Sequence, residues 1–286
     1  MPSIVILAAG LGSRFGGDKQ LVEFGNKKLT LMEYNLLNAV QAGFDEVIFV
    51  IRPELTGVLH KQVISRLPEG LQYEIVLQTL DNLPRGCIAP VERSKPLGTA
   101  HALWCCHDLL TKSFAVINAD DYYGAQAFEL LLTQAKETAN HHLMVAYQIQ
   151  NTLSEFGSVN RGLCQLSTED HLVQIEECQN IIQQGDKITG KLGVDDKLIE
   201  LDKESLISMN CWLFNTDIFP LLAEEIRQVL QQNILTVECY LPNVVMKQIV
   251  QQQKKVKVLE TTEHWFGLTY QQDCEKVSEK VDAIFT

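Results

Sequence analysis

The sequence lacks the segments that carry a chain into or through a membrane. Its opening, MPSIVILAAG, has no basic residue and too short an apolar stretch for a signal peptide. No apolar run elsewhere approaches the roughly 18 residues that a spanning helix needs. We therefore expect a cytoplasmic protein with no membrane partner.

Basic residues are also scarce. Lys and Arg total 24 against 36 Asp and Glu, so the formal net charge of the 286 residues is −12. Because a chain of this sign repels nucleic-acid backbones, we expect no nucleic acid among its partners. A small anionic substrate is compatible with the charge, since a few local cations and a metal ion can outweigh it at one site.

Several patterns of metal and nucleophile chemistry are absent. None of the 8 cysteines forms a C-x-x-C pair, which excludes zinc-ribbon and thioredoxin sites, and we expect reduced thiols. No G-x-S-x-G segment is present, and the histidines show no ligand spacing. With 46% hydrophobic and 21% charged residues, the composition excludes a disordered chain and a coiled coil.

The first half alternates between strands and helices. Apolar β-branched runs predict buried strands at residues 3–8, 46–51, 73–78 and 114–118. The capping box Thr30-Leu-Met-Glu33 starts a helix that stops at Gly43, and further helices are expected at 53–66, 99–110 and 124–139. Strands separated by helices predict right-handed crossovers and a mainly parallel sheet.

From about residue 140 the pattern becomes mixed. We expect strands at 142–150, 157–160, 172–177, 206–214 and 255–260, and helices at 216–232, 237–253 and 271–283. Polar stretches at 163–170 and 185–201 predict loops. The expected fold is α/β, a Rossmann-like three-layer αβα sandwich with a mainly parallel, mixed central sheet. It forms a single domain over 1–286, with halves at 1–140 and 141–286.

The segment most informative about chemistry follows the first strand. Residues 7–19 read Leu-Ala-Ala-Gly-Leu-Gly-Ser-Arg-Phe-Gly-Gly-Asp-Lys. Its glycines let backbone N–H groups approach an anion, and Arg14 and Lys19 add two cations, as a triphosphate requires. The loop is no P-loop, because Asp18 replaces the lysine, and no dinucleotide fingerprint, because Phe15 replaces the third glycine. A glycine-rich turn with two surface cations is the alternative.

Two further segments lie at strand or helix ends. Residues 95–102, Lys-Pro-Leu-Gly-Thr-Ala-His-Ala, offer free N–H groups that suit contact with a flat base edge; an ordinary helix start capped by Thr99 is the alternative. Asp120 and Asp121 follow the fourth strand, where carboxylate oxygens suit Mg²⁺ that bridges phosphates. A helix cap at Asp121 and a turn bond at Asp120 are the alternatives there.

In this order, the three segments resemble the nucleotidyltransferases of the sugar-nucleotide pyrophosphorylase superfamily, which have a GT-A-like fold. The resemblance covers most of the chain and is strongest over residues 4–124. It implies transfer of a nucleoside monophosphate from a nucleoside triphosphate to a phosphorylated small-molecule acceptor, a sugar-1-phosphate. Pyrophosphate would be released, and Mg²⁺ would be the cofactor.

The matching positions imply roles for individual residues. Arg14, Lys19 and Asp120 would be catalytic, with Asp120 also a metal ligand. Implied nucleotide-binding residues are Ala8, Ala9, Gly10, Gly12, Ser13, Gln78, Gly98 and Thr99. Implied acceptor-binding residues are Gly157, Glu177 and Asn210.

The sequence departs from the family pattern at two positions. Cys178 stands where the family usually has a lysine that touches the sugar phosphate, so another cation must serve or the acceptor differs. The loop 79–95, with Arg85, Arg93 and Lys95, is one source of such a cation. Gly267 stands where a second metal aspartate is usual, and Asp273 is our candidate substitute.

Two other functions stay open. The glycine loop also resembles that of cytidylyltransferases acting on choline phosphate or a polyol phosphate. A nucleotide-sugar-binding regulatory domain without turnover is the second. Among bases, Gln78 and Gly98 favour UTP, dTTP or CTP over purine triphosphates, and a homo-oligomer is left open.

Overall fold

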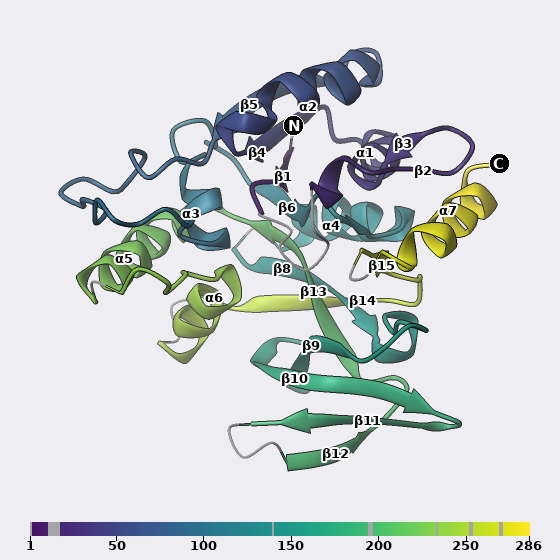
Figure 1. Cartoon of the computed structure of the whole chain (residues 1–286). Helices are drawn as coiled ribbons and strands as arrows, with labels where there is room; N and C mark the ends of the chain where they lie inside the picture. The colour runs from purple at the N-terminus through teal and green to yellow at the C-terminus, as the bar shows by residue number, and fades with distance from the viewer. Residues whose placement is uncertain are drawn as a thin grey trace.

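The computed structural model describes residues 2–10, 18–138, 140–193, 197–232, 234–251, 254–268 and 271–286. Its centre is a mixed sheet of 11 strands (Figure 1). Four strands form the parallel part of this sheet, in the order β5-β4-β1-β6. They are β5 (Gln72–Leu77), β4 (Glu46–Ile51), β1 (Ser3–Leu7) and β6 (Phe114–Asn118).

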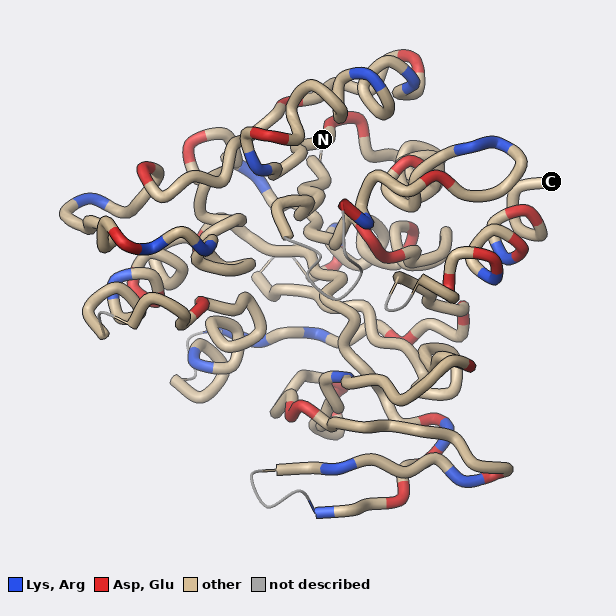
Figure 2. The backbone as a smooth tube through the Cα atoms, viewed as in Figure 1, with Lys and Arg blue, Asp and Glu red and all other residues tan. Residues whose placement is uncertain are grey.

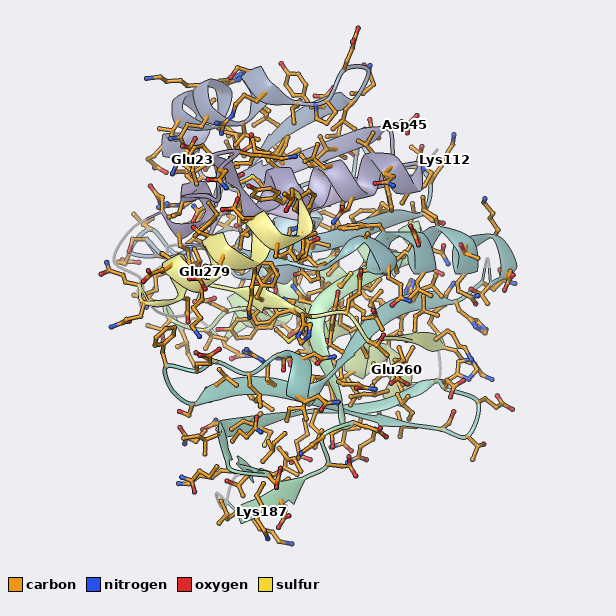
Figure 3. The ribbon with its side chains drawn as sticks, turned by 90° about the vertical axis from the view of Figure 1, so that its right-hand side faces the viewer. Glu23, Asp45, Lys112, Lys187, Glu260 and Glu279 are labelled. Carbon is orange, nitrogen blue, oxygen red and sulfur yellow. The ribbon has the colours of Figure 1, made fainter. Side chains whose placement is uncertain are left out.

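Strand β13 (Leu206–Phe214) joins this parallel part to the rest of the sheet. It runs antiparallel to β6, to β8 (His142–Gln148) and to β9 (Val159–Leu166). Strand β14 (Val256–Thr261) pairs parallel with β8. Beyond β9 the sheet continues as an antiparallel extension of β10 (Leu172–Gln184), β11 (Lys187–Leu192) and β12 (Lys197–Leu201). Figure 3 shows Lys187, the first residue of β11, at the lower end of the molecule.

Helices cover both faces of the sheet, which gives three layers (Figure 1). Successive strand residues point to opposite faces, so Ile4 and Ile6 pack in one core and Val5 and Leu7 in the other. The first core includes α1 (Leu31–Ala42), α2 (Thr56–Gln62) and α4 (Ala125–Glu137). The second includes α3 (Thr99–Trp104), α5 (Phe219–Gln231) and α6 (Leu241–Val250).

A third, smaller core lies beside the carboxyl end of β6. There α7 (Asp273–Ile284) packs on two short ribbons, β2 (Glu23–Phe24) with β3 (Leu29–Thr30) and β7 (Asp121–Tyr122) with β15 (Phe266–Gly267). The remaining elements are short 3₁₀ turns: η1 (Lys19–Leu21), η2 (Pro53–Leu55), η3 (Ile64–Arg66), η4 (Ile149–Asn151) and η5 (Thr216–Ile218). The N-terminal and C-terminal segments thereby meet next to the end of β6.

The structure confirms the expected α/β class and the parallel strands of the first half. The predicted strands 46–51, 114–118 and 206–214 match β4, β6 and β13 to the residue. The predicted loop 185–201 is wrong, because it contains all of β11 and β12, and the predicted loop 163–170 is wrong at its start, because residues 163–166 belong to β9. Strands β11 and β12 expose polar residues, Lys187, Lys197 and Glu200, and β12 also exposes Leu198. The predicted helix 53–66 divides into η2, α2 and η3.

Charged residues of both signs and free cysteines are spread along the chain. Lys and Arg are dispersed among Asp and Glu along the backbone (Figure 2). All eight cysteines are free thiols, five of them buried. None of the helices in the described part of the chain has the length and apolar character that a bilayer-spanning helix needs.

The capping box of α1 offers a test of how local sequence stabilises the fold. Thr30 Oγ1 accepts from the Glu33 amide at 3.3 Å, and Glu33 Oε2 accepts from the Thr30 amide at 2.8 Å. Because Thr30→Ala leaves a helix-end N–H without its partner, we expect the free energy of unfolding in urea to fall by about 1 kcal/mol. Thr133→Ala, at an exposed position inside α4, is the control. Equal losses in the two variants would contradict the cap's role.

Candidate functional site

Two side chains that the sequence analysis singled out are in direct contact. Lys19 Nζ forms an ion pair with Asp120 Oδ2, and both side chains are partly exposed. Lys19 belongs to η1, and Asp120 follows the last residue of β6. The same ammonium donates to the carbonyl oxygen of Leu268 at 3.3 Å. Segments from the start, middle and end of the chain therefore meet at this ion pair.

The order of the parallel strands explains why these residues meet. Strands β1 and β6 are neighbours, and the Ala119 amide continues their pairing by donating to Leu7 O at 3.1 Å. On the other side of β1, the Ala8 amide donates to Val50 O at 2.8 Å. The ion pair therefore lies at the carboxyl edge of the parallel strands, where ligands bind in open α/β sheets.

The start of the glycine loop lies at this edge. Ala8 and Ala9 are buried and Gly10 is exposed. Gly12, Ser13 and Arg14 lie outside the described residues, so their implied roles stay predictions.

Asp121 is a second carboxylate at the same edge, and it is buried. Its Oδ2 accepts from Asn118 Nδ2 at 2.9 Å. Burial, together with the nearby Asp120 charge, raises the pKa of Asp121 to about 7. It does not cap α4, whose N-cap is Gly124. A buried carboxylate beside a second one favours a cation that neutralises both.

The position of Asp121 explains why residue 267 is glycine. Gly267 pairs directly with Asp121 across β15 and β7. A Cβ at residue 267 would lie 2.4 Å from Asp121 Oδ1 and 2.8 Å from the Trp265 ring, so a side chain there would displace the carboxylate. Asp121 therefore occupies the space beside Gly267, and this chain carries its second carboxylate on β7.

A chain of side-chain hydrogen bonds orients Asp121. Trp212 Nε1 donates to Asn210 Oδ1 at 2.7 Å, Asn210 Nδ2 donates to Asn118 Oδ1 at 2.8 Å, and Asn118 in turn donates to Asp121. Asn210 has a left-handed backbone, φ 62°, at an irregularity in β13. Such strain in a non-glycine residue is often found at functional sites.

A cavity of about 400 Å³ opens beside this network. Most of its described lining residues have polar side chains, among them the acceptor-binding candidates Glu177 and Asn210. Gly157 precedes β9 and is not among the described lining residues, so its acceptor role has no geometric support here. The lining residues are Thr99, Asn118, Asp121, Asn160, Arg161, Gly162, Ile175, Glu177, Ser208, Met209, Asn210, Tyr240, Pro242, Asn243 and Met246.

A second cavity, of about 250 Å³, lies at the end of β5 and includes Gln78 and His101 in its wall. His101 Nε2 is 2.7 Å from Asn82 O, so Nε2 carries the proton and Nδ1 is an acceptor. Gln78 Nε2 then donates to His101 Nδ1 at 3.1 Å and to Gly98 O at 3.0 Å. Both amide protons are used, and Gln78 Oε1 is the acceptor that remains for a ligand.

Gly98 and Thr99 connect the two cavities. Gly98 has φ 94°, and a Cβ there would lie 2.6 Å from Cys239 O, so glycine is needed for conformation and for space. Thr99 Oγ1 accepts from the Leu241 amide at 2.9 Å. The Ala100 amide donates to Cys239 O at 3.0 Å. The start of α3 is thus bonded to the start of α6.

The sequence analysis offered other cations and a third carboxylate. The Arg93 guanidinium donates to the carbonyl oxygens of Lys95, Pro96, Ile234 and Val237, so it fastens one loop to another. Cys178 is fully buried. Among the described residues no three Asp, Glu, His or Cys side chains form a metal-binding group, so Asp273 does not join Asp120 and Asp121 in one. Its role as a ligand stays a prediction.

Arg161, on β9, is a site residue that the sequence analysis missed. It lines the larger cavity, and its guanidinium lies over the Trp265 ring at 4.6 Å from the centroid. Burial lowers the pKa of Arg161 to about 10, partly offset by Asp121 and Asp273. A single arginine in a strand next to a glycine carries no sequence signal, so only the packing shows it.

The burial of Asp121 predicts a specific pH dependence. Folded Asp121 holds its proton to a higher pH than unfolded Asp121, whose pKa is near 4. Stability should therefore decrease as the pH rises from about 4 to about 7 and stay low above that. We expect Asp121→Asn to be more stable than the wild type at pH 8 in EDTA, and the gain to vanish by pH 4. Thermal unfolding across this range measures it; a gain independent of pH would contradict it.

Comparisons with known proteins agree with this geometry. The family model described as "Nucleotidyl transferase" matches residues 3–266. No curated protein sequence is significantly similar to the chain. The family model covers most of the chain, and the assignment of the chain to a family therefore rests on this match.

Three solved structures show the same fold. The inositol-1-phosphate CTP transferase from T. maritima is 17% identical, with a TM-score of 0.64, covering 98% of this chain and 94% of that one. A putative glucose-1-phosphate thymidylyltransferase from Bacillus anthracis, in complex with a sucrose, is 13% identical, with a TM-score of 0.66, covering 100% and 97%. UDP-glucose pyrophosphorylase complexed with UDP-glucose is 14% identical, with a TM-score of 0.63, covering 99% of both chains. The family model therefore shows that the chain belongs to the nucleotidyl transferase family, and the Lys19–Asp120 pair at the end of its parallel sheet agrees with this.

Proposed function

We propose that the protein transfers a nucleoside monophosphate from a nucleoside triphosphate to a sugar-1-phosphate and releases pyrophosphate. One observation carries the proposal: Lys19 and Asp120 meet at the strand edge from which the Gln78 cavity and the Asn210 cavity both open. At this place the lysine can neutralise charge on a phosphate directly, and the carboxylate can do so by holding a metal ion. The two cavities give separate places for a base and an acceptor.

The residues present fit a reaction that depends on positioning and charge. The sugar-1-phosphate oxygen attacks the α-phosphorus in line, the bond from that phosphorus to the bridging oxygen breaks, and pyrophosphate leaves. No general base is needed, because the attacking phosphate is already ionised. Lys19 would move from Asp120 to the charge that develops around the α-phosphate. Arg14 keeps its predicted role at the leaving phosphates.

The carboxylates of Asp120 and Asp121 fit Mg²⁺. Both supply the hard oxygen donors that this ion prefers, and their mutual repulsion, which contributes to the raised pKa of Asp121, is relieved by a cation. When bound, the ion would neutralise charge on the α-phosphate. The chain's own residues hold Asp121, through Asn118 and the Asn210 network, next to Asp120 beyond the end of β6.

The proposal gives the two halves of the chain different binding roles. We assign nucleotide binding to residues 1–140 and acceptor binding to 141–286, although Thr99, Asn118 and Asp121 of the first half also line the acceptor cavity. The unpaired state of all eight cysteines supports a reducing, cytoplasmic setting.

A cytidylyltransferase acting on a polyol phosphate is the second candidate. It is favoured by the buried Cys178 at the place of the usual lysine and by the fold shared with the inositol-1-phosphate CTP transferase. A non-catalytic binding domain is less compatible, because the Lys19–Asp120 pair is intact. Pyrophosphate release with UTP, dTTP, CTP and purine triphosphates, each with a panel of hexose 1-phosphates, choline phosphate and inositol phosphate, separates the three.

Substitution of either charged residue tests the assignment. In Lys19→Ala and Asp120→Ala we expect pyrophosphate release to fall by about 10²–10³, because each removes one charge contact at the reacting phosphate. Lys112→Ala, on the turn before β6, is the control and should keep full activity. Near wild-type rates in both site variants would reject these roles.

The fixed amide of Gln78 predicts the base. Its Oε1 can accept from N3–H of uracil or thymine, whereas N3 of cytosine in the same position is itself an acceptor. We expect kcat/KM with UTP or dTTP to exceed that with CTP by roughly tenfold or more, and Gln78→Ala to reduce the ratio. A preference for CTP would instead support the polyol-phosphate reaction.

A further inference from the structure

Arg161 is a cation that lies at the edge of a cavity with no carboxylate partner at ion-pair distance among the described residues. Its guanidinium donates to two backbone carbonyls, Thr152 O at 2.6 Å and Asn160 O at 3.0 Å. Its Nε is buried and has no hydrogen-bond partner. A partly buried guanidinium whose hydrogen-bond acceptors are uncharged retains an attraction for an anion.

The surroundings of Arg161 hold it in place for such an anion. The Trp265 ring lies under the guanidinium, which restricts its rotation and excludes water from one side. The two backbone acceptors are uncharged carbonyl oxygens and so do not neutralise the guanidinium. The carboxylates of Asp121 and Asp273 are near enough to act on its pKa, and Asp121 lines the same cavity.

The cavity wall provides one cation for one anionic group. Arg161 is its sole basic residue within the described part of the chain. The other polar groups are amides, hydroxyls and the carboxylates of Asp121 and Glu177. Amides, hydroxyls and the Glu177 carboxylate suit the hydroxyls of a small neutral body. A ligand that is anionic at one end and rich in hydroxyls at the other matches this distribution.

The register of the sheet relates Arg161 to an open question. Arg161 lies directly opposite Cys178 on the paired strands β9 and β10. Directly opposite residues on antiparallel strands are close neighbours, so Arg161 supplies a cation next to the position where the family pattern has a lysine. Arg93 is not available, because backbone carbonyls hold its guanidinium.

We infer that Arg161 binds the phosphate group of the acceptor and thereby selects phosphorylated acceptors. The inference rests on the proposed function for the identity of the ligand. A guanidinium suits this role because it can donate two parallel hydrogen bonds to one phosphate. The phosphate would lie at the Asp121 end of the cavity and the hydroxyl-bearing body against Glu177 and Asn210.

The test separates acceptor binding from nucleotide binding. In Arg161→Gln we expect KM for the acceptor, taken as the most active hexose 1-phosphate, to rise roughly 30-fold, while KM for the triphosphate stays unchanged. Arg161→Lys keeps the charge but loses the paired donors, so its KM for the acceptor should lie between those of the wild type and Arg161→Gln. Arg227→Gln removes an exposed arginine of α5 and is the matched control, with no change expected.

A charge relocation makes the test sharper. Arg161→Gln combined with Cys178→Lys returns a cation to the opposite strand, and we expect it to recover at least part of the acceptor affinity. Thermal unfolding of every variant identifies any that fail to fold. If Arg161→Gln fails to fold both alone and with Cys178→Lys, the acceptor KM of Arg161→Lys tests the inference. An unchanged acceptor KM in a folded Arg161 variant, or an equal rise for both substrates, overturns the inference.

Binding measurements keep this proposal distinct from the proposed function. If the wild type releases no pyrophosphate with any pair of substrates, the transferase assignment fails, whereas the anion site is still testable by calorimetry with hexose 1-phosphates and inorganic phosphate. Binding by the wild type and Arg227→Gln but not by Arg161→Gln supports the site. Failure of the wild type to bind any of these phosphates, or equal binding by Arg161→Gln, overturns it.

Discussion

The ion pair between Lys19 and Asp120 is the interaction on which the site depends. Partly exposed pairs contribute little to stability, so its importance is chemical. In the unliganded protein the two charges neutralise each other, and the ion pair keeps both side chains in position for a ligand. In the proposed reaction, a triphosphate with its metal ion would supply both partners at once, an anion for the ammonium and a cation for the carboxylate. The strand order that places β1 beside β6 is therefore the fold's main contribution to function.

The parallel core could be predicted from the sequence because its signals are local. Strands β4 and β6 are short apolar runs, and α1 carries a capping box at one end and a glycine at the other. The edge strands β11 and β12 lack such signals. Both strands expose residues to solvent and mix polar with apolar residues without strict alternation, so the segment resembles a loop. Their strand conformation comes from pairing with β10, which depends on distant residues.

The same distinction holds for the candidate site. Lys19 and Asp120 belong to recognisable segments, and the sequence alone predicted that they would meet. The space that Asp121 takes beside Gly267, and the place of Arg161 opposite Cys178, follow from strand register between segments far apart in the chain. Register is set by the whole sheet, so no local pattern could reveal that one carboxylate and one arginine stand near the two departures from the family pattern.

The hydrogen bonds between the starts of α3 and α6 make one piece of backbone a wall common to both cavities. Gly98 fixes the amide of Gln78 on one side, while Tyr240 and Pro242, just beyond Cys239, line the other cavity. A change in the shape of one cavity at this wall therefore also affects the other cavity. A displacement of α6 that made room for a bulkier acceptor would also displace Gly98, so under the proposed function the choice of nucleotide is tied to the choice of acceptor.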